Sequence, residues 1–158
     1  MRKLREGVVS VGSRKALTLV EVALGAAILT VVLLSIISVY IKCIELVSAS
    51  KSMTFAVNEA QAKMEGIRDH NYYLIYADYN NGTFTVPGIA PGGNKGVIYV
   101  DNSDPDLLKV TISVCWRERG RIIGEDINFN GVLDSGEDKN YNGIIDSTAQ
   151  LVLLITQR

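Results

Sequence analysis

A run of twenty residues without a charge, residues 22–41, constrains this chain more than any other part of its sequence. As an α-helix, such a run is about 30 Å long, which is the thickness of the hydrocarbon core of a bilayer. The segment before it, residues 1–16, carries five basic residues and one acid, a net charge of +4. Because basic flanks stay on the cytoplasmic side, we expect a single membrane span with the C-terminal part of the chain across the membrane.

Composition excludes several classes of protein. Hydrophobic residues make up 47% of the chain and charged residues 21%, which argues against a wholly disordered chain. A net charge of −1 gives no global case for nucleic-acid binding. Cys43 and Cys115 are too few for a disulfide framework, and we expect both to be unpaired. The sequence has no serine–histidine–acid set and no phosphate-binding loop, so we expect a protein that is not an enzyme.

One acid, Glu21, lies at the entrance of the span. A carboxylate costs about 2.5–3.5 kcal/mol at the centre of a bilayer and less near the interface, so an acid in this place indicates a functional role and needs a partner. Cleavage between Ala16 and Leu17 would give Leu17 a new ammonium group. The ammonium group of a neighbouring subunit could then neutralise Glu21 within an assembly.

Residues 14–21 (RKALTLVE) resemble the prepilin cleavage motif of type IV pilins and type II secretion pseudopilins. That family has a basic leader, a small residue, the cleavage point, then Thr-Leu-(Ile/Val)-Glu and a long apolar helix. The resemblance implies cleavage after Ala16 by prepilin peptidase and methylation of the Leu17 amine. It also implies that Glu21 aligns the protein with other pilin or pseudopilin subunits in a helical filament. The alternative, a plain signal anchor for a small periplasmic or extracellular domain, leaves Glu21 unexplained.

The helix is predicted to continue beyond the membrane. Apolar residues recur at helical spacings after residue 45, namely Leu46, Met53, Val57, Ala60, Met64 and Ile67. No proline interrupts residues 17–68, so we expect one helix of about 50 residues, about 75–80 Å long. Its first half is apolar all round and needs lipid or sister helices, whereas its second half has one apolar face for a globular domain.

Short strands are predicted after the helix, at residues 83–86, 96–101, 107–118 and 150–156. Four tyrosines within residues 72–79 are expected in a loop, as a contact surface or as packing beneath it. In the third strand, the residues expected to face the helix are apolar, namely Val110, Ile112, Val114 and Trp116. The residues that alternate with them should face outward, namely Thr111, Ser113, Cys115 and Arg117. The predicted fold is α+β, with a long N-terminal helix packed on a small antiparallel sheet. Segments 109–121 and 150–156 resemble the C-terminal hairpin of PilV-type minor pilins and of I-class minor pseudopilins.

A specific motif lies between the last two predicted strands. Residues 126–137 fit the calcium-loop pattern D-x-[DN]-x-[DN]-G-x5-E completely. Calcium takes six to eight oxygen ligands from a loop that turns sharply, here at Gly131. The predicted ligands of the first loop are side chains and one backbone carbonyl, namely Asp126, Asn128, Asn130, Asp134 and Glu137, with the carbonyl of Val132.

A second copy of the loop follows at a repeat of twelve residues. Its predicted ligands are Asp138, Asn140, Asn142, Asp146 and the carbonyl of Ile144. Its last ligand position is Ala149, so the second site is incomplete unless Glu125, Glu137 or another group completes it. Because strands are predicted on both sides in place of EF-hand helices, the loops resemble those of dockerin-like or thrombospondin-type repeats. We expect a calcium-ordered loop at the tip of a β-hairpin.

The charge of this segment agrees with a cation site. Residues 125–146 hold six acids and one base, Lys139, a net charge of −5. Such acids repel one another unless a cation neutralises them. A solvated turn rich in Asn, Asp and Gly that binds no metal is the alternative interpretation.

The sequence thus indicates three parts: a cleaved leader (1–16), a transmembrane and assembly half of the helix (17–45), and a head (46–158) with the calcium-loop insert (125–148). Together with the resemblance to prepilins, these three parts indicate a minor pilin or pseudopilin, a structural subunit that initiates, caps or decorates a filament. It would lie in the bacterial inner membrane with its head in the periplasm and then join a pilus or a secretion pseudopilus. A membrane-anchored calcium-binding module that never polymerises is the alternative.

Overall fold

The structure, a computed structural model, describes residues 18–157, so Ala16 and Leu17 at the expected cleavage point lie outside the described residues. The chain divides between Ile44 and Glu45 into two compact units. Helix α1 (Leu19–Arg68) contributes to both units, and its 50 residues confirm the predicted length. The fold class is α+β, as predicted, because the sheet of the second unit packs on this helix.

In the first unit, α1 exposes every side chain from residue 19 to residue 44. By length and composition, this helix could cross a membrane. The hydroxyl groups of Thr30, Ser35 and Ser38 each donate to the carbonyl oxygen four residues earlier, at 2.8 Å. These polar side chains therefore need no water, which suits an apolar environment.

In the second unit, α1 has one buried stripe, formed by Ala56, Ala60, Met64 and Ile67. Met53 and Val57 are partly buried beside it, as the spacing predicts. The prediction for Leu46 is wrong, since its side chain is 68% exposed. The packed stripe thus begins about two turns later than the sequence pattern indicates, because the sheet covers only the last turns of the helix.

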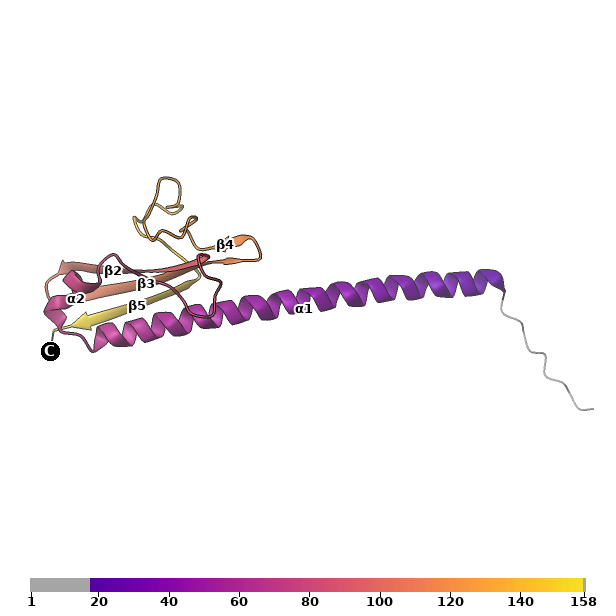
Figure 1. Cartoon of the computed structure of the whole chain (residues 1–158), viewed down its shortest axis with the longest axis horizontal. Coiled ribbons are helices and arrows are strands. Elements are labelled where there is room, and N and C mark those ends of the chain that lie inside the picture. The colour runs from indigo at the N-terminus through magenta and orange to yellow at the C-terminus, as the bar shows by residue number, and fades with distance from the viewer. Residues whose placement is uncertain (1–17, 158) are drawn as a thin grey trace, which may run out of the picture. The chain divides into compact units, whose positions relative to one another are not determined.

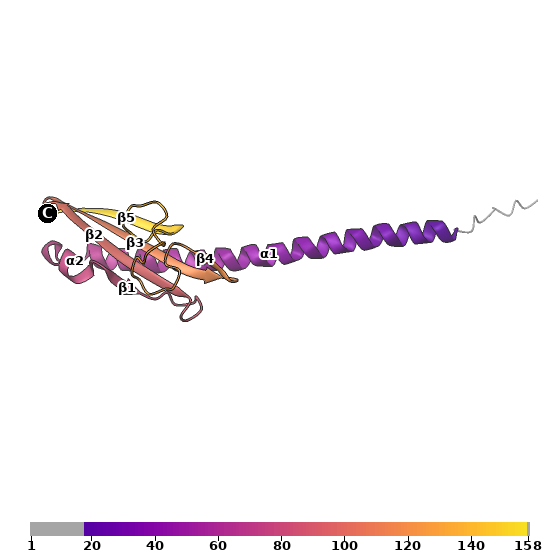
Figure 2. The same cartoon turned by 90° about the horizontal axis from the view of Figure 1, so that it is seen from above.

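The sheet has five antiparallel strands: β1 (Gly82–Phe84), β2 (Asn94–Asp104), β3 (Leu107–Glu118), β4 (Arg121–Ile123) and β5 (Ala149–Thr156). Strand β3 is central. Strand β2 pairs along one edge of it, and β4 and β5 follow each other along the other edge (Figures 1 and 2). Strand β4 was not predicted, and β2 extends beyond residues 96–101 at both ends.

The face of β3 toward α1 carries the main core. Val110, Ile112 and Val114 are completely buried, and Trp116 is nearly so. They form one cluster with the buried stripe of α1, which confirms the predicted orientation of the apolar set.

The opposite face of β3 differs from the prediction. Thr111, Ser113 and Cys115 point away from α1, but they are 6%, 0% and 0% exposed and do not face solvent. The segment between β4 and β5 packs on Cys115, because its apolar residues Phe129 and Ile145 need a surface on which to be buried. Ser113 accepts a hydrogen bond from the Gln150 side chain at 3.1 Å. Of the alternating set, only Arg117 is exposed.

The tyrosine-rich segment is a short helix, α2 (Tyr72–Tyr79), and not the predicted loop. Asn71 caps it, since its side chain accepts a hydrogen bond from Tyr73 N at 3.1 Å. Ile75 anchors the helix in the core, Tyr72 and Tyr79 pack partly against that core, and Tyr73 remains 71% exposed. The cluster therefore divides between packing and exposed surface.

Candidate functional site

The insert between β4 and β5 lies on the face of the sheet away from α1 (Figure 1). The predicted hairpin is confirmed, since β3 and β5 pair antiparallel and the insert lies in the connection between them. The insert does not extend from the tip, however, because it adds β4 to the same edge of β3 and folds back over the sheet. Its base is closed by a backbone hydrogen bond from Glu125 N to Asp146 O at 2.9 Å. Tyr99 on β2 also holds it, because its hydroxyl accepts from Ile145 N at 3.1 Å.

Gly124 brings the insert close to the sheet. Its φ of +101° lies in the region that favours glycine, and a Cβ there would come within 2.3 Å of the Cys115 sulfur. Burial raises the pKa of the Cys115 thiol, so this group stays protonated at neutral pH. Both cysteines are free, as predicted, with Cys43 exposed and Cys115 buried.

The first loop folds around the carboxylate of Asp126, which is completely buried. This carboxylate accepts hydrogen bonds from Asn130 N at 3.1 Å and from Gly131 N at 2.8 Å. Asn128 and Asn130 each accept from the backbone N–H two residues later, at 3.0 and 2.6 Å. Gly131 has a φ of +78°, which supplies the sharp turn that the motif predicts.

The remaining acids of the first loop close it. The amide nitrogens of Asn128 and Asn130 both donate to one oxygen of Asp134, each at 2.8 Å. Glu137, which is 4% exposed, bridges the two ends of the loop. Its Oε1 accepts from Ile127 N at 2.7 Å and its Oε2 accepts from Asp134 N at 3.0 Å. Hydrogen bonds within the loop thus hold all five predicted side-chain ligands.

The second loop repeats this geometry. Asp138 accepts from Asn142 N at 3.1 Å and from Gly143 N at 3.0 Å, as Asp126 does one repeat earlier. The amides of Asn140 and Asn142 both donate to one oxygen of Asp146. Gly143 has a φ of +77°, almost equal to that of Gly131. The two twelve-residue repeats are therefore two copies of one local fold.

The predicted carbonyl ligands hold equivalent places in the two loops. The backbone N–H groups of Val132 and Ile144 donate to Asn130 and Asn142 at 2.6 and 2.9 Å. One position later in each copy, Leu133 and Ile145 turn toward the sheet, where Leu133 packs partly and Ile145 is completely buried. The loops therefore combine an inner apolar anchor with outer oxygen-bearing groups.

The charge of the insert is unbalanced. Within residues 18–157, no lysine, arginine or histidine forms an ion pair with any acid of residues 125–146. In the same described residues, no three His, Cys, Asp or Glu side chains converge as a metal-binding group. The carboxylate oxygens accept hydrogen bonds from asparagine amides and from backbone N–H groups. The potential ligands of each loop are therefore its acids together with the Asn side-chain oxygens and the backbone carbonyl oxygens.

Glu21 lies in the first turn of α1, where the helix dipole favours a negative charge. Its backbone N–H donates to the Thr18 side chain at 3.3 Å, which is half of a capping box. Glu21 is therefore exposed at the N-terminal end of an apolar helix surface.

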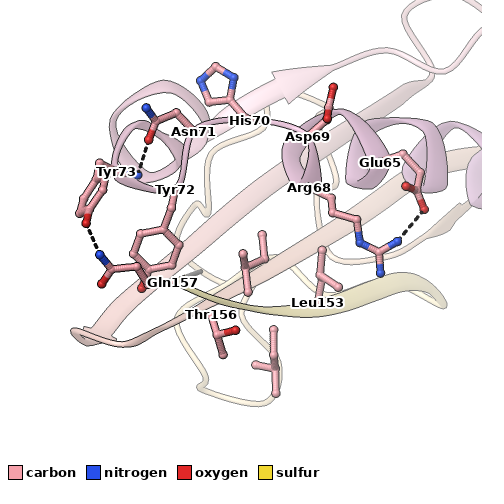
Figure 3. Close-up of a pocket in the computed structure, with 12 residues that line it drawn as sticks. Glu65, Arg68, Asp69, His70, Asn71, Tyr72, Tyr73, Leu153, Thr156 and Gln157 are labelled. Carbon is pink, nitrogen blue, oxygen red and sulfur yellow. Dashed lines mark hydrogen bonds and ion pairs between the residues drawn. The ribbon is translucent and has the colours of Figure 1, made fainter.

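A further hollow, of about 920 Å³, lies between the end of α1, the start of α2 and β5 (Figure 3). Its polar groups pair with one another. Arg68 forms an ion pair with Glu65 at 3.3 Å, and the Gln157 amide donates to the Tyr73 hydroxyl. His70 points to Asp78, at 2.8 Å. The sequence gives no sign of this hollow, because it depends on which strand lies beside the helix.

Comparisons with protein-family models, with curated proteins and with solved structures find no match to this chain.

Proposed function

We propose that this protein is a minor pilin or pseudopilin, a structural subunit of a type IV pilus or of a type II secretion pseudopilus. The observation that carries the proposal is the division of α1. Residues 19–44 are exposed and apolar all round with a single acid, Glu21, in the first turn, whereas the later turns bury one stripe under an antiparallel sheet. A helix of this kind needs lipid before assembly and sister helices after it.

The mature N-terminus tests processing. We expect protein purified from cells with a prepilin peptidase to start at a methylated Leu17, because residues 14–21 resemble the cleavage motif. Intact-mass spectrometry of the purified protein measures this directly. An unprocessed start at Met1 in such cells would support the alternative, a membrane-anchored module that does not polymerise.

Assembly is tested at Glu21. Glu21→Gln keeps the shape of the side chain and removes its charge, so the variant should insert in the membrane but be lost from sheared filaments. Glu65→Gln is the matched control, since Glu65 is an exposed acid near the other end of the same helix. Equal incorporation of both variants into filaments would overturn the proposed role of Glu21.

Calcium is the proposed ligand of the insert. Bound calcium would stabilise the insert on the face of the sheet away from α1. The support is the complete motif at residues 126–137, the folded loop around Asp126, and the lack of a cationic partner among the described residues. Few carboxylates per loop suggest an affinity of about 10⁻⁴–10⁻³ M, in the range of extracellular modules. The full chain in detergent should melt at a higher temperature in calcium than in chelator, and Asp126→Ala should remove most of this difference.

A further inference from the structure

The second loop lacks an acid at its own last ligand position, where the sequence has Ala149. In the structure, a glutamate from outside this loop occupies the equivalent place. Glu125 Oε1 accepts from Lys139 N, and Glu125 Oε2 accepts from Asp146 N, both at 3.1 Å. These donors are the second and ninth residues of the second loop.

Glu137 makes the same two bonds in the first loop. Its carboxylate bridges Ile127 N and Asp134 N, which are the second and ninth residues of that loop. Glu125 directly precedes the first loop and closes the second, whereas Glu137 directly precedes the second loop and closes the first. The first loop is thus closed by its own last residue, Glu137, and the second loop by Glu125 from outside it.

The burial of charge is an independent indication of a bound cation. Glu125, Asp126 and Glu137 are 8%, 0% and 4% exposed, so all three carboxylates are more than nine-tenths buried. None forms an ion pair with a described lysine, arginine or histidine, and backbone N–H groups supply no net charge. Buried carboxylates without a countercharge are strongly unfavourable, and a divalent cation in each loop would neutralise them.

We infer that the insert binds two calcium ions and that Glu125, not a residue of the second loop, supplies the closing carboxylate of the second site, as Glu137 does for the first. This inference rests on the proposed calcium binding. The second ion then joins the two ends of the insert, because its ligands come from Glu125 and from residues 138–146. The sites are coupled, because Glu125 adjoins Asp126 of the first site and Glu137 adjoins Asp138 of the second, so loss of one closing acid weakens the other site.

The number of ions per chain tests the role of Glu125. Isothermal titration of calcium into the full chain in detergent should give two ions, and Glu125→Gln and Glu137→Gln should each reduce the number to one. The remaining ion should bind several-fold more weakly because the loops are coupled. Asp106→Asn, in an exposed turn outside the insert, is the control and should keep both ions.

Double variants show which loop Glu125 serves. Glu125→Gln with Asp138→Asn alters the second site twice and should still bind one ion, whereas Glu125→Gln with Glu137→Gln should bind none. Two ions in Glu125→Gln, or none in Glu125→Gln with Asp138→Asn, would overturn the assignment of Glu125 to the second site while leaving calcium binding intact. No binding by the wild-type chain would instead overturn the calcium proposal itself.

A spectroscopic measurement covers the case in which a variant folds poorly. Calcium should shift the backbone amide resonances of Lys139 and Asp146 in the wild-type chain, since both groups contact Glu125. Unshifted resonances for both amides at saturating calcium would contradict a second ion closed by Glu125.

Discussion

Residues 110–116 of β3 are buried on both faces of the sheet, but by different means. Toward α1, the apolar side chains of β3 meet an apolar helix stripe. On the other face, a small cluster around Val97, Cys115 and Ile145 lies beneath a segment whose outer groups are mostly acids and amides. The face toward α1 is therefore stabilised by apolar packing alone. Burial of the outer face depends in addition on how the charges of the insert are compensated.

The largest effect is expected in the helix-side core. Ile112→Ala removes a completely buried side chain from the centre of β3 and should lower the free energy of unfolding by about 2–5 kcal/mol. Denaturant unfolding of the full chain in detergent measures the loss. The loss should be the same in calcium and in chelator, and a strong calcium dependence would show that the two faces do not differ as described.

Calcium removal should act mainly on the outer face. Under the proposed calcium binding, each site would add about 2.7 kcal/mol to the free energy of unfolding at a calcium concentration 100 times the dissociation constant. Chelation should therefore lower the melting temperature, and it should speed hydrogen exchange at Ile145 N more than in β3. Uniform protection of the head in chelator would contradict the comparison.

Gly124→Ala should separate the insert from the sheet. The new methyl group would meet the Cys115 sulfur, and the φ of +101° is strained for alanine, so we expect a loss of about 1–3 kcal/mol. Gly136→Ala is a matched control, since it has a φ of +90° but no heavy atom near the added Cβ. Cys115 should react with a thiol reagent faster in the Gly124 variant than in the control.

The smallest effect concerns Glu118, which joins the end of β3 to α1. Ser52 and Ser48 donate to its carboxylate at 2.6 and 2.8 Å, and these bonds lower the pKa of Glu118 from its ordinary value of 4.5. A lowered folded pKa stabilises the protein above pH 4.5, and this contribution is lost as the pH falls through the folded pKa. Glu118→Gln should therefore cost about 1 kcal/mol at pH 7, and this cost should decrease as the pH falls through the folded pKa of Glu118.

The serines provide the control for Glu118. A Ser48→Ala and Ser52→Ala double variant should reproduce the loss at pH 7, since it removes the same hydrogen bonds. Equal stability of the wild type and Glu118→Gln at every pH would show that these bonds contribute nothing.

Regular apolar patterns made much of the fold predictable. Three such patterns are the apolar run at residues 22–41, the helical stripe from Met53 to Ile67 and the alternation in β3. Each can be read from neighbouring residues, so the local sequence is enough to predict the element. Helix α2 was missed because four tyrosines do not favour a helix and because the burial of Ile75 depends on the tertiary structure, although the cap at Asn71 is a local signal.

The candidate metal loops were also predictable as motifs, because oxygen-bearing residues and Gly131 and Gly143 recur at fixed positions. The position of these loops on the sheet was not predictable, since nothing in the local sequence indicates that Phe129 and Ile145 pack on the face away from α1. The role of Glu125 was open for the same reason, because it acts on donors fourteen and twenty-one residues away.

The sequence by itself determined the long helix, the strand pattern of β3 and the two repeats, because each follows from neighbouring residues in one local conformation. Only the tertiary structure decided that the insert covers the second face of the sheet and that Glu125 reaches the second loop. These features join residues distant in the chain, and they depend on which surfaces the folded sheet leaves to be covered.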